Sequence, residues 1–313
     1  MAILKLAPAC KDYIWGGDRL IKNYDKGFKG SHLAETWEVS CHKDGLSTIA
    51  EGDGSGETLR EYINEKGMEV LGKDCEKFGD FPILIKFIDA RDNLSIQVHP
   101  GDSYAREHEG DNGKTEMWYV VDCEEGSFLY YGFSRKVSRE EFQRRIADNT
   151  LTDVLNKVKV KQGDVFFIES GVIHAIGAGI LIAEIQQSSN VTYRVYDYGR
   201  KDRQGHERKL HISDALNVTR RDKMERGYSF GPHVAKCEYF TVDKIYLDGR
   251  TMSSMKGFVG EESFVSLLVI DGSGTIRQGE QTLDIKKGDS IFISAGSGSY
   301  EMEGELEGLM TRV

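Results

Sequence analysis

Short runs of β-branched and aromatic residues, separated by Gly or Asp, recur along almost the whole chain. Such runs are typical of β-strands joined by tight turns, and many of them in series indicate a sandwich or a barrel. Glycine is abundant at 35 of 313 residues and proline is scarce at 4, as many turns and a strand-rich interior require. We therefore expect a mainly β protein. The expected strands are 81–90, 93–99, 116–122, 127–133, 164–170, 179–186, 192–198, 239–247, 263–271, 275–279 and 290–295.

Part of this strand pattern occurs twice. The segment KQGDVFFIESGVIHAI (161–176) aligns without gaps with KKGDSIFISAGSGSYEM (286–302) up to its histidine, and an upstream pair, 116–132 and 263–279, is also similar. Strand–turn–strand sequences can repeat by chance in a β protein. The alternative interpretation is two related barrels, one N-terminal and one near residues 235–313.

A few helices interrupt the strands. Thr58 and Glu61, and likewise Ser138 and Glu141, have the spacing of a capping box at the start of a helix. The expected helices cover about 58–71, 138–158 and 212–219.

The composition excludes several classes of protein. A net charge of −10 with no basic block argues against a nucleic-acid partner, and no stretch approaches the ~20 apolar residues of a membrane span. Five widely spaced cysteines without a CxxC motif indicate free thiols in a reducing cytoplasm. Without a heptad pattern or an exposed apolar helix, we expect a monomer.

Five polar side chains have the spacing of a metal site. Gln97 and His99 are two residues apart on an expected strand, so they face the same side, and Lys114 and Glu116 are arranged in the same way. His174 follows a later strand. Two imidazoles, a carboxylate and an amide oxygen suit a divalent ion such as Zn²⁺. A packed histidine is the commoner role for a single such residue, and it is the competing interpretation.

The second copy of the repeat lacks this set. His174 corresponds to Ser299, and the counterpart of Glu116 falls near Val265. We therefore expect a metal in the first barrel and none in the second.

One further pair of charged residues lies among large side chains. Arg194 follows Glu184 by ten residues, in a strand that carries Tyr193 and Tyr196. An interior arginine needs an anionic partner because it does not lose its proton. That partner is either Glu184 or an anionic ligand such as a sugar phosphate. The chain has no P-loop, GxGxxG, GxSxG or HExxH motif, so nucleotide and serine-hydrolase functions find no support.

Four motifs in order, LSIQVHP, GKTEMWYVV, SGVIHAIG and SNVTYRVYDYGR, resemble the type I mannose-6-phosphate isomerases in their short bacterial form. IWGG near the start and AETWEVSCHKDGLSTI fit the same family. The match covers about residues 8–220 and continues more weakly to the end. HPGD in place of the commoner HPD, and Thr115 before Glu116, are departures that remove no expected ligand.

The resemblance implies two cupin-type, jelly-roll-like β-barrels: a catalytic one within 1–234 and a second one, without metal ligands, within 235–313. It implies one Zn²⁺ per chain, held by Gln97, His99, Glu116 and His174. It also implies Arg194 as the catalytic arginine, with Lys114 and Glu184 as pocket residues.

The implied reaction interconverts mannose 6-phosphate and fructose 6-phosphate. Its enediolate develops negative charge that a metal and an arginine stabilise, while a base carries the proton. The sequence does not choose between Lys114 and Glu184 as that base. Two other functions compete: a different metal-dependent cupin enzyme, such as a dioxygenase, and a cupin that binds a sugar phosphate without turning it over.

Overall fold

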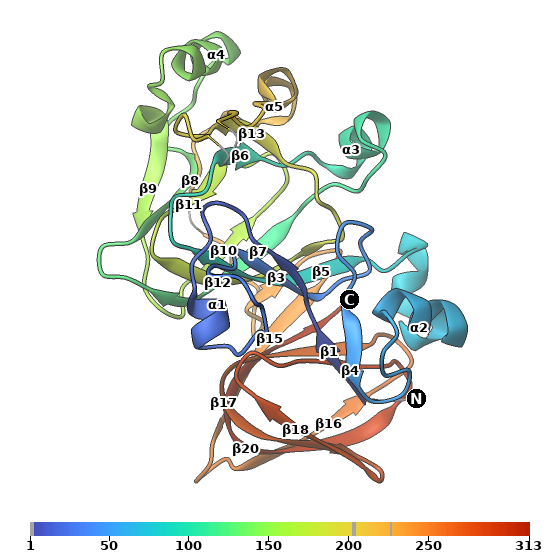
Figure 1. Ribbon diagram of the computed structural model, residues 1–313. Coiled ribbons are helices and arrows are strands. Elements are labelled where there is room, and N and C mark those ends of the chain that lie inside the picture. The colour runs from blue at the N-terminus through green and yellow to red at the C-terminus, as the bar shows by residue number, and fades with distance from the viewer. Residues whose placement is uncertain (1–2, 202–204, 226) are drawn as a thin grey trace.

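The computed structural model describes residues 3–201, 205–225 and 227–313 (Figure 1). Its strands pair antiparallel in three sheets of six, five and nine strands, so the expectation of a mainly β protein is confirmed. The six-stranded sheet has the order β10 (Val165–Ile168), β7 (Glu116–Cys123), β12 (Ile180–Gln187), β5 (Ile83–Ala90), β3 (Glu35–Val39), β2 (Ala9–Lys11).

The five-stranded sheet has the order β13 (Tyr193–Tyr196), β6 (Ile96–Val98), β11 (His174–Ile176), β8 (Phe128–Phe133), β9 (Leu155–Lys159). The nine-stranded sheet runs β14 (Ala235–Lys236), β15 (Thr241–Asp248), β20 (Gly298–Arg312), β17 (Val265–Gln278), β19 (Ser290–Ile293), β1 (Ile3–Ala7), β4 (Thr48–Glu51), with β16 (Ser254–Val259) on β20 and β18 (Gln281–Lys286) on β17.

The six-stranded sheet is the middle layer of the molecule (Figure 1). Every residue of β5 and β12 is buried, which explains their nearly continuous apolar sequence. One face of this sheet packs on the nine-stranded sheet, in a core that contains Phe87 of β5 and Phe292 of β19. The other face, with Ile88, Trp118 and Ile182, packs toward the five-stranded sheet.

Side chains alternate along a strand, and this alternation places the polar residues of the middle sheet. Lys86 shares a face with Ile88, Glu116 with Trp118, and Glu184 with Ile182. All three polar residues therefore point between the six- and five-stranded sheets, the space in which the site is found.

The sequence repeat corresponds to a repeated turn. Asp164 Oδ2 accepts the amide N–H of Lys161 at 3.0 Å, and Asp289 Oδ2 accepts that of Lys286 at 3.0 Å. Both turns place a glycine at positive φ (Gly163 +85°, Gly288 +89°), which a glycine adopts without steric cost.

Strand register extends this correspondence. Glu116 on β7 pairs with Ile168 on β10, whereas in the nine-stranded sheet Val265 on β17 pairs with Ile293 on β19. Val265 thus takes the position of Glu116, as the sequence alignment indicates.

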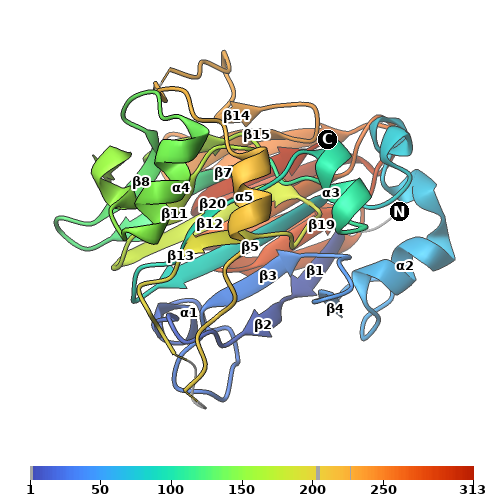
Figure 2. The same ribbon diagram turned by 90° about the horizontal axis from the view of Figure 1, so that it is seen from above.

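The helices are α1 (Arg19–Lys22), α2 (Leu59–Lys66), α3 (Asp102–His108), α4 (Arg139–Ala147) and α5 (Ile212–Val218), with 3₁₀ turns η1 (Met68–Val70), η2 (Lys73–Phe78) and η3 (Leu151–Val154). α3, α4 and α5 lie at the end of the molecule farthest from the nine-stranded sheet, and spread across it when seen from above (Figure 2). No helix of the described residues is long and apolar enough to cross a membrane.

The helix starts follow the capping signals, but two helix ends differ from expectation. The helix expected over 58–71 ends at Lys66, because Gly67 has φ +92° and the chain continues as the 3₁₀ turn η1. Thr58 and Glu61 form the capping box, and Ser138 caps α4. The predicted helix over 138–158 stops at residue 147, because Asn149 takes a left-handed conformation with φ +55°. The rest of the expected helix forms the 3₁₀ turn η3 and then the strand β9, which is hydrogen-bonded to β8.

Two strands from the N-terminal part of the chain, β1 and β4, belong to the nine-stranded sheet. Ile3 pairs with Ile293 of β19, and Leu6 of β1 pairs with Ile49 of β4. The nine-stranded sheet is therefore built from both ends of the chain, and a division at residue 234 stays a prediction.

Candidate active site

Three buried side chains converge between the six- and five-stranded sheets. His99 follows β6, Glu116 begins β7 and His174 begins β11. The Nε2 atoms of His99 and His174 lie 3.7 Å and 3.3 Å from the two carboxylate oxygens of Glu116. The three ligand atoms lie within 4.8 Å of one another, and no residue of the trio is more than 1 % exposed.

Backbone carbonyls fix the direction of both imidazoles. His99 Nδ1 donates to the carbonyl oxygen of Val191 at 2.7 Å, and His174 Nδ1 donates to that of Val172 at 2.8 Å. Each Nε2 is then left as a lone pair directed at Glu116, the tautomer that a metal-binding histidine uses.

The charge and burial of these side chains also suit metal binding. Burial lowers the pKa of His174 to about 4 and that of His99 well below its ordinary value, so both rings are neutral. Both carboxylate oxygens of Glu116 are buried, and besides the two imidazoles the charged group beside them is the ammonium of Lys114, 2.5 Å from Oε2. Two neutral nitrogens facing such a carboxylate fit a divalent cation, and they form a candidate metal site.

Gln97 lies beside this trio on β6, directly opposite His174 in the strand register. Its amide nitrogen is 3.5 Å from His174 Nε2, and its oxygen accepts from the hydroxyl of Ser95 at 3.3 Å. Half a turn of the amide places the oxygen, the atom that a cation takes, toward the trio.

Lys114 contacts two members of the trio, Glu116 and His99. Its ammonium lies 2.5 Å from Glu116 Oε2, 3.3 Å from His99 Nε2 and 3.5 Å from Glu184 Oε1. Burial lowers the pKa of Lys114, but the attraction of Glu116 and Glu184 outweighs it and raises the pKa above its ordinary value. The buried carboxylates of Glu116 and Glu184 therefore hold a positive charge, that of Lys114, beside the two imidazoles.

Glu184 is the centre of a second group of contacts. Trp118 Nε1–H donates to its Oε2 at 2.8 Å, and the ammonium of Lys86 lies 3.6 Å from its Oε1. Burial raises the pKa of Glu184, but Lys114 and Lys86 outweigh burial and lower it, so the carboxyl is ionised. Glu35 continues the chain of alternating charge, 3.5 Å beyond Lys86.

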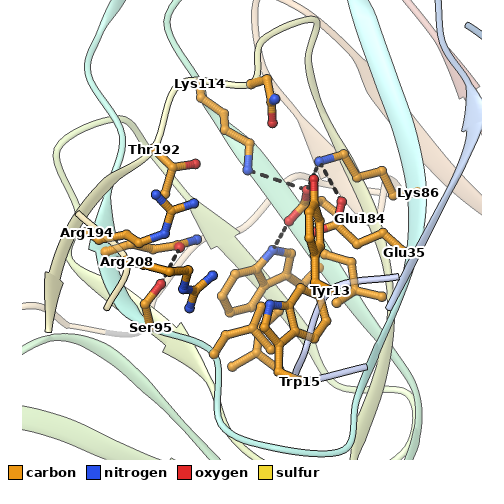
Figure 3. Close-up of a pocket in the computed structure, with 16 residues that line it drawn as sticks. Tyr13, Trp15, Glu35, Lys86, Ser95, Lys114, Glu184, Thr192, Arg194 and Arg208 are labelled. Atoms are coloured by element: carbon orange, nitrogen blue, oxygen red, sulfur yellow. Dashed lines mark hydrogen bonds and ion pairs between the residues drawn. The ribbon is translucent and has the colours of Figure 1, made fainter. Parts of the chain in front are cut away.

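A cavity of about 150 Å³ opens over these residues. Figure 3 shows Arg194 and Arg208 on one side of it and Lys86, Glu184, Tyr13 and Trp15 on the other. Its charged lining residues are Glu35, Lys86, Lys114, Glu184, Arg194 and Arg208.

Arg194 does not pair with Glu184. Its register partner on β6 is Gln97, so it is placed beside the metal-site strand. Among the described residues no carboxylate forms an ion pair with Arg194, and its buried Nε has no hydrogen-bond partner. Of the two partners that the sequence allowed, Glu184 is engaged with Trp118, Lys86 and Lys114.

Comparison with known proteins identifies the family of this chain. Residues 3–128 match the family described as phosphomannose isomerase type I, catalytic domain, and residues 232–313 match the mannose-6-phosphate isomerase cupin domain. Mannose-6-phosphate isomerase of Streptococcus mutans is 37 % identical over 302 residues, which cover 94 % of this chain and 93 % of that protein. The chain belongs to the type I mannose-6-phosphate isomerase family.

Further relatives match this chain over nearly its whole length. Mannose-6-phosphate isomerase ManA of Bacillus subtilis is 35 % identical over 317 residues, covering 98 % of this chain and 97 % of the relative. The crystal structure of a Bacillus subtilis mannose 6-phosphate isomerase superposes with a TM-score of 0.89 at 33 % identity, covering all of both chains. The cupin-type architecture expected from the sequence is therefore confirmed.

Within this member of the family, the structure adds pocket residues that the sequence did not single out. Lys86 carried a readable signal, because it is a lone cation in the apolar run FPILIKFIDA, and it pairs in register with Glu184. Tyr13 and Arg208 carried none. Arg208 reaches the cavity from a charged loop, held by the carboxylate of Asp197 at 2.6 and 2.7 Å.

Proposed function

We propose that this chain interconverts mannose 6-phosphate and fructose 6-phosphate through an enediolate. The observation that carries the proposal is the buried trio of His99, Glu116 and His174, with both Nε2 lone pairs turned to one carboxylate. Gln97 and Lys114, which contact the trio, line the adjoining cationic cavity. The proposed metal is one Zn²⁺ per chain, held by this trio together with the oxygen of Gln97.

A bound divalent ion supplies a Lewis acid that stabilises the negative charge developing on the sugar oxygens. Arg194 faces the same cavity and stays charged, because an arginine keeps its proton even when burial lowers its pKa. Its guanidinium then stabilises the enediolate more than the neutral sugar, which lowers the barrier of the chemical step.

The proton that moves between C1 and C2 needs a carrier. Glu184 is ionised and lines the cavity, whereas Lys114 is held in its charged form by two carboxylates. We therefore assign the basic role to Glu184 and the role of a fixed positive charge beside it to Lys114. Glu184→Gln should abolish the exchange of substrate hydrogen with solvent deuterium, while Lys114→Met should slow turnover but leave residual exchange.

The rest of the cavity suits an anionic group. Lys86, Lys114, Arg194 and Arg208 bring four positive charges, and Glu35 and Glu184 bring two negative ones. A surplus of cations in a small cavity favours a dianion, which is the charge of a sugar phosphate.

The decisive experiment is a coupled assay with mannose 6-phosphate before and after chelation. We expect turnover that a chelator abolishes and Zn²⁺ restores. Turnover without any bound metal would refute the metal role, and binding of the sugar phosphate without turnover would favour the non-catalytic alternative. Oxygen uptake in the same preparation would favour the dioxygenase alternative.

We further propose a monomer that acts in the cytoplasm, without a membrane or nucleic-acid partner. The five unpaired cysteines and the acidic composition support this proposal. We also propose that 1–234 forms the catalytic unit and 235–313 a second barrel without metal ligands, since Val265 and Ser299 stand at the positions of Glu116 and His174.

A further inference from the structure

Two segments that carry the candidate site residues lie backbone against backbone. The amide of Lys114 donates to the carbonyl oxygen of Pro100 at 3.0 Å, directly after His99. Gly113 approaches so closely that a Cβ on it would lie 2.5 Å from the amide nitrogen of Asp102. The position of Lys114 relative to His99 therefore depends on how these two segments are held together.

The side chain of Asp102 holds them. Its Oδ1 accepts the amide N–H of Gly113 at 2.8 Å and the side-chain N–H of Gln187 at 2.9 Å. The oxygen of the same Gln187 amide accepts the backbone N–H of Thr115 at 2.8 Å. One carboxylate thus fixes the backbone on both sides of Lys114, and its own orientation sets the geometry of the segment.

That carboxylate is reached from the C-terminal part of the chain. Tyr239 lies just before β15 of the nine-stranded sheet, and its hydroxyl donates to Asp102 Oδ2 at 3.1 Å. Its half-buried ring packs against Phe78, with ring centroids 5.8 Å apart. Burial and the negative charge of Asp102 raise the pKa of Tyr239, so the hydroxyl remains a donor.

A second donor, Arg106, lies near Asp102, but it holds the carboxylate less firmly than Tyr239 does. Arg106 comes within 3.5 Å of Oδ2, but its side chain is 63 % exposed. An exposed ion pair of this kind contributes little and is screened by salt. Tyr239, whose ring packs on Phe78, is the group that orients the carboxylate.

We propose that Tyr239 is a positioning residue for the metal site, through which the C-terminal segment 235–313 holds the Asp102 carboxylate and thereby the relative placement of His99 and Lys114. The segment has no ligand of its own, yet it would set the affinity for the metal. This inference rests on the proposed function only in taking the His99–Glu116–His174 trio as the metal site.

A matched control distinguishes this role from a general one in holding the two parts together. The hydroxyl of Tyr119 on β7 also crosses to the C-terminal segment, where it donates to Glu307 at 2.6 Å. Its side chain lies on the face of the sheet opposite Glu116, in the core shared with the nine-stranded sheet. Tyr119→Phe therefore removes a comparable hydroxyl contact without touching Asp102.

The test compares full-length Tyr239→Phe and Tyr119→Phe with the parent. Zn²⁺ affinity is measured by competition with a chromogenic chelator, and amide hydrogen exchange is measured over 113–115. For Tyr239→Phe we expect Zn²⁺ binding about 3- to 10-fold weaker, a smaller effect than the roughly 10- to 100-fold of groups that bond a ligand directly, with faster exchange over 113–115. Tyr119→Phe should keep the parent affinity and exchange rate, even where its melting temperature falls.

Equal losses of Zn²⁺ affinity in both variants, or a Tyr239→Phe protein with parent affinity and parent exchange, would overturn the inference. Asp102→Asn provides a second route, and it should weaken Zn²⁺ binding at least as much as Tyr239→Phe. A parent protein that binds Zn²⁺ but does not isomerise mannose 6-phosphate would refute the proposed function, whereas the comparison of affinity and exchange would still decide this inference.

Discussion

Replacing Arg194 by alanine separates a catalytic role from a structural one. If the guanidinium stabilised the fold by neutralising Glu184, its removal would leave a buried carboxylate unpaired, at a cost of ~3–5 kcal/mol. At ~2–4 °C per kcal/mol, the melting temperature would fall by roughly 6–20 °C.

The contacts predict a different result. Glu184 keeps Trp118, Lys86 and Lys114 as partners whether or not Arg194 is present, and Arg194 forms no ion pair among the described residues. The variant should therefore stay within ~1 kcal/mol of the parent in stability, which corresponds to a few degrees in melting temperature.

Activity should respond far more strongly. Loss of a donor aimed at a developing oxyanion typically lowers kcat by ~10²–10³, or about 2.7–4 kcal/mol in the barrier. Arg194→Lys keeps the charge but loses the planar fork, so it should also be impaired. Melting temperature by calorimetry and kcat with mannose 6-phosphate, on metal-loaded protein, are the two measurements. A variant that melts far lower and yet keeps most of its kcat would refute the reasoning.

The other predictions concern the metal and the surrounding charges. His99→Ala removes one nitrogen donor, so elemental analysis should find well below one metal per chain and turnover should be lost; full metal retention would contradict the ligand assignment. Chelation should lower the free energy of unfolding by about 4 kcal/mol if the ion was held at 1,000 times its Kd, and a calorimetric trace unchanged in demonstrably metal-free protein would argue against it. Burial opposes ionisation of Asp197, but Arg208 and Arg200 outweigh it and lower its pKa, so the stability that it contributes is present at neutral pH and is lost as the pH falls below about 4. Asp197→Asn should therefore flatten the acid side of a plot of melting temperature against pH, and a plot that overlies that of the parent would show that Asp197 has no such role.

Local features of this molecule were readable from the sequence. The capping box at Thr58 depends on residues three apart, and the shared face of Gln97 and His99 depends on strand alternation. The repeat led to Val265 as the counterpart of Glu116, which the strand register reproduces. In each case the geometry follows from neighbours in the chain or from a turn that occurs twice.

Features that depend on distant segments were not readable. Nothing near Tyr239 signals that its hydroxyl meets Asp102, and nothing in the loop around Arg208 signals that it enters the cavity. The end of α4 was misplaced because the residues after Asn149 are compatible with a helix, and only pairing with β8 makes them a strand. Tertiary contacts, rather than local propensity, decide these positions.

The place of β1 in the nine-stranded sheet also governs how the chain is made. β1 is synthesised before the other described strands, whereas its partner β19 is among the last of them. The edge of β1 that pairs with β19 must therefore stay open through nearly the whole of translation, although β1 can pair early with β4 along its other edge, and this long sequence separation slows the last step of assembly. Until β19 emerges, this edge of β1 presents free backbone donors and acceptors to other nascent chains, so the yield of the protein in a cell depends on keeping the edge covered or away from other chains.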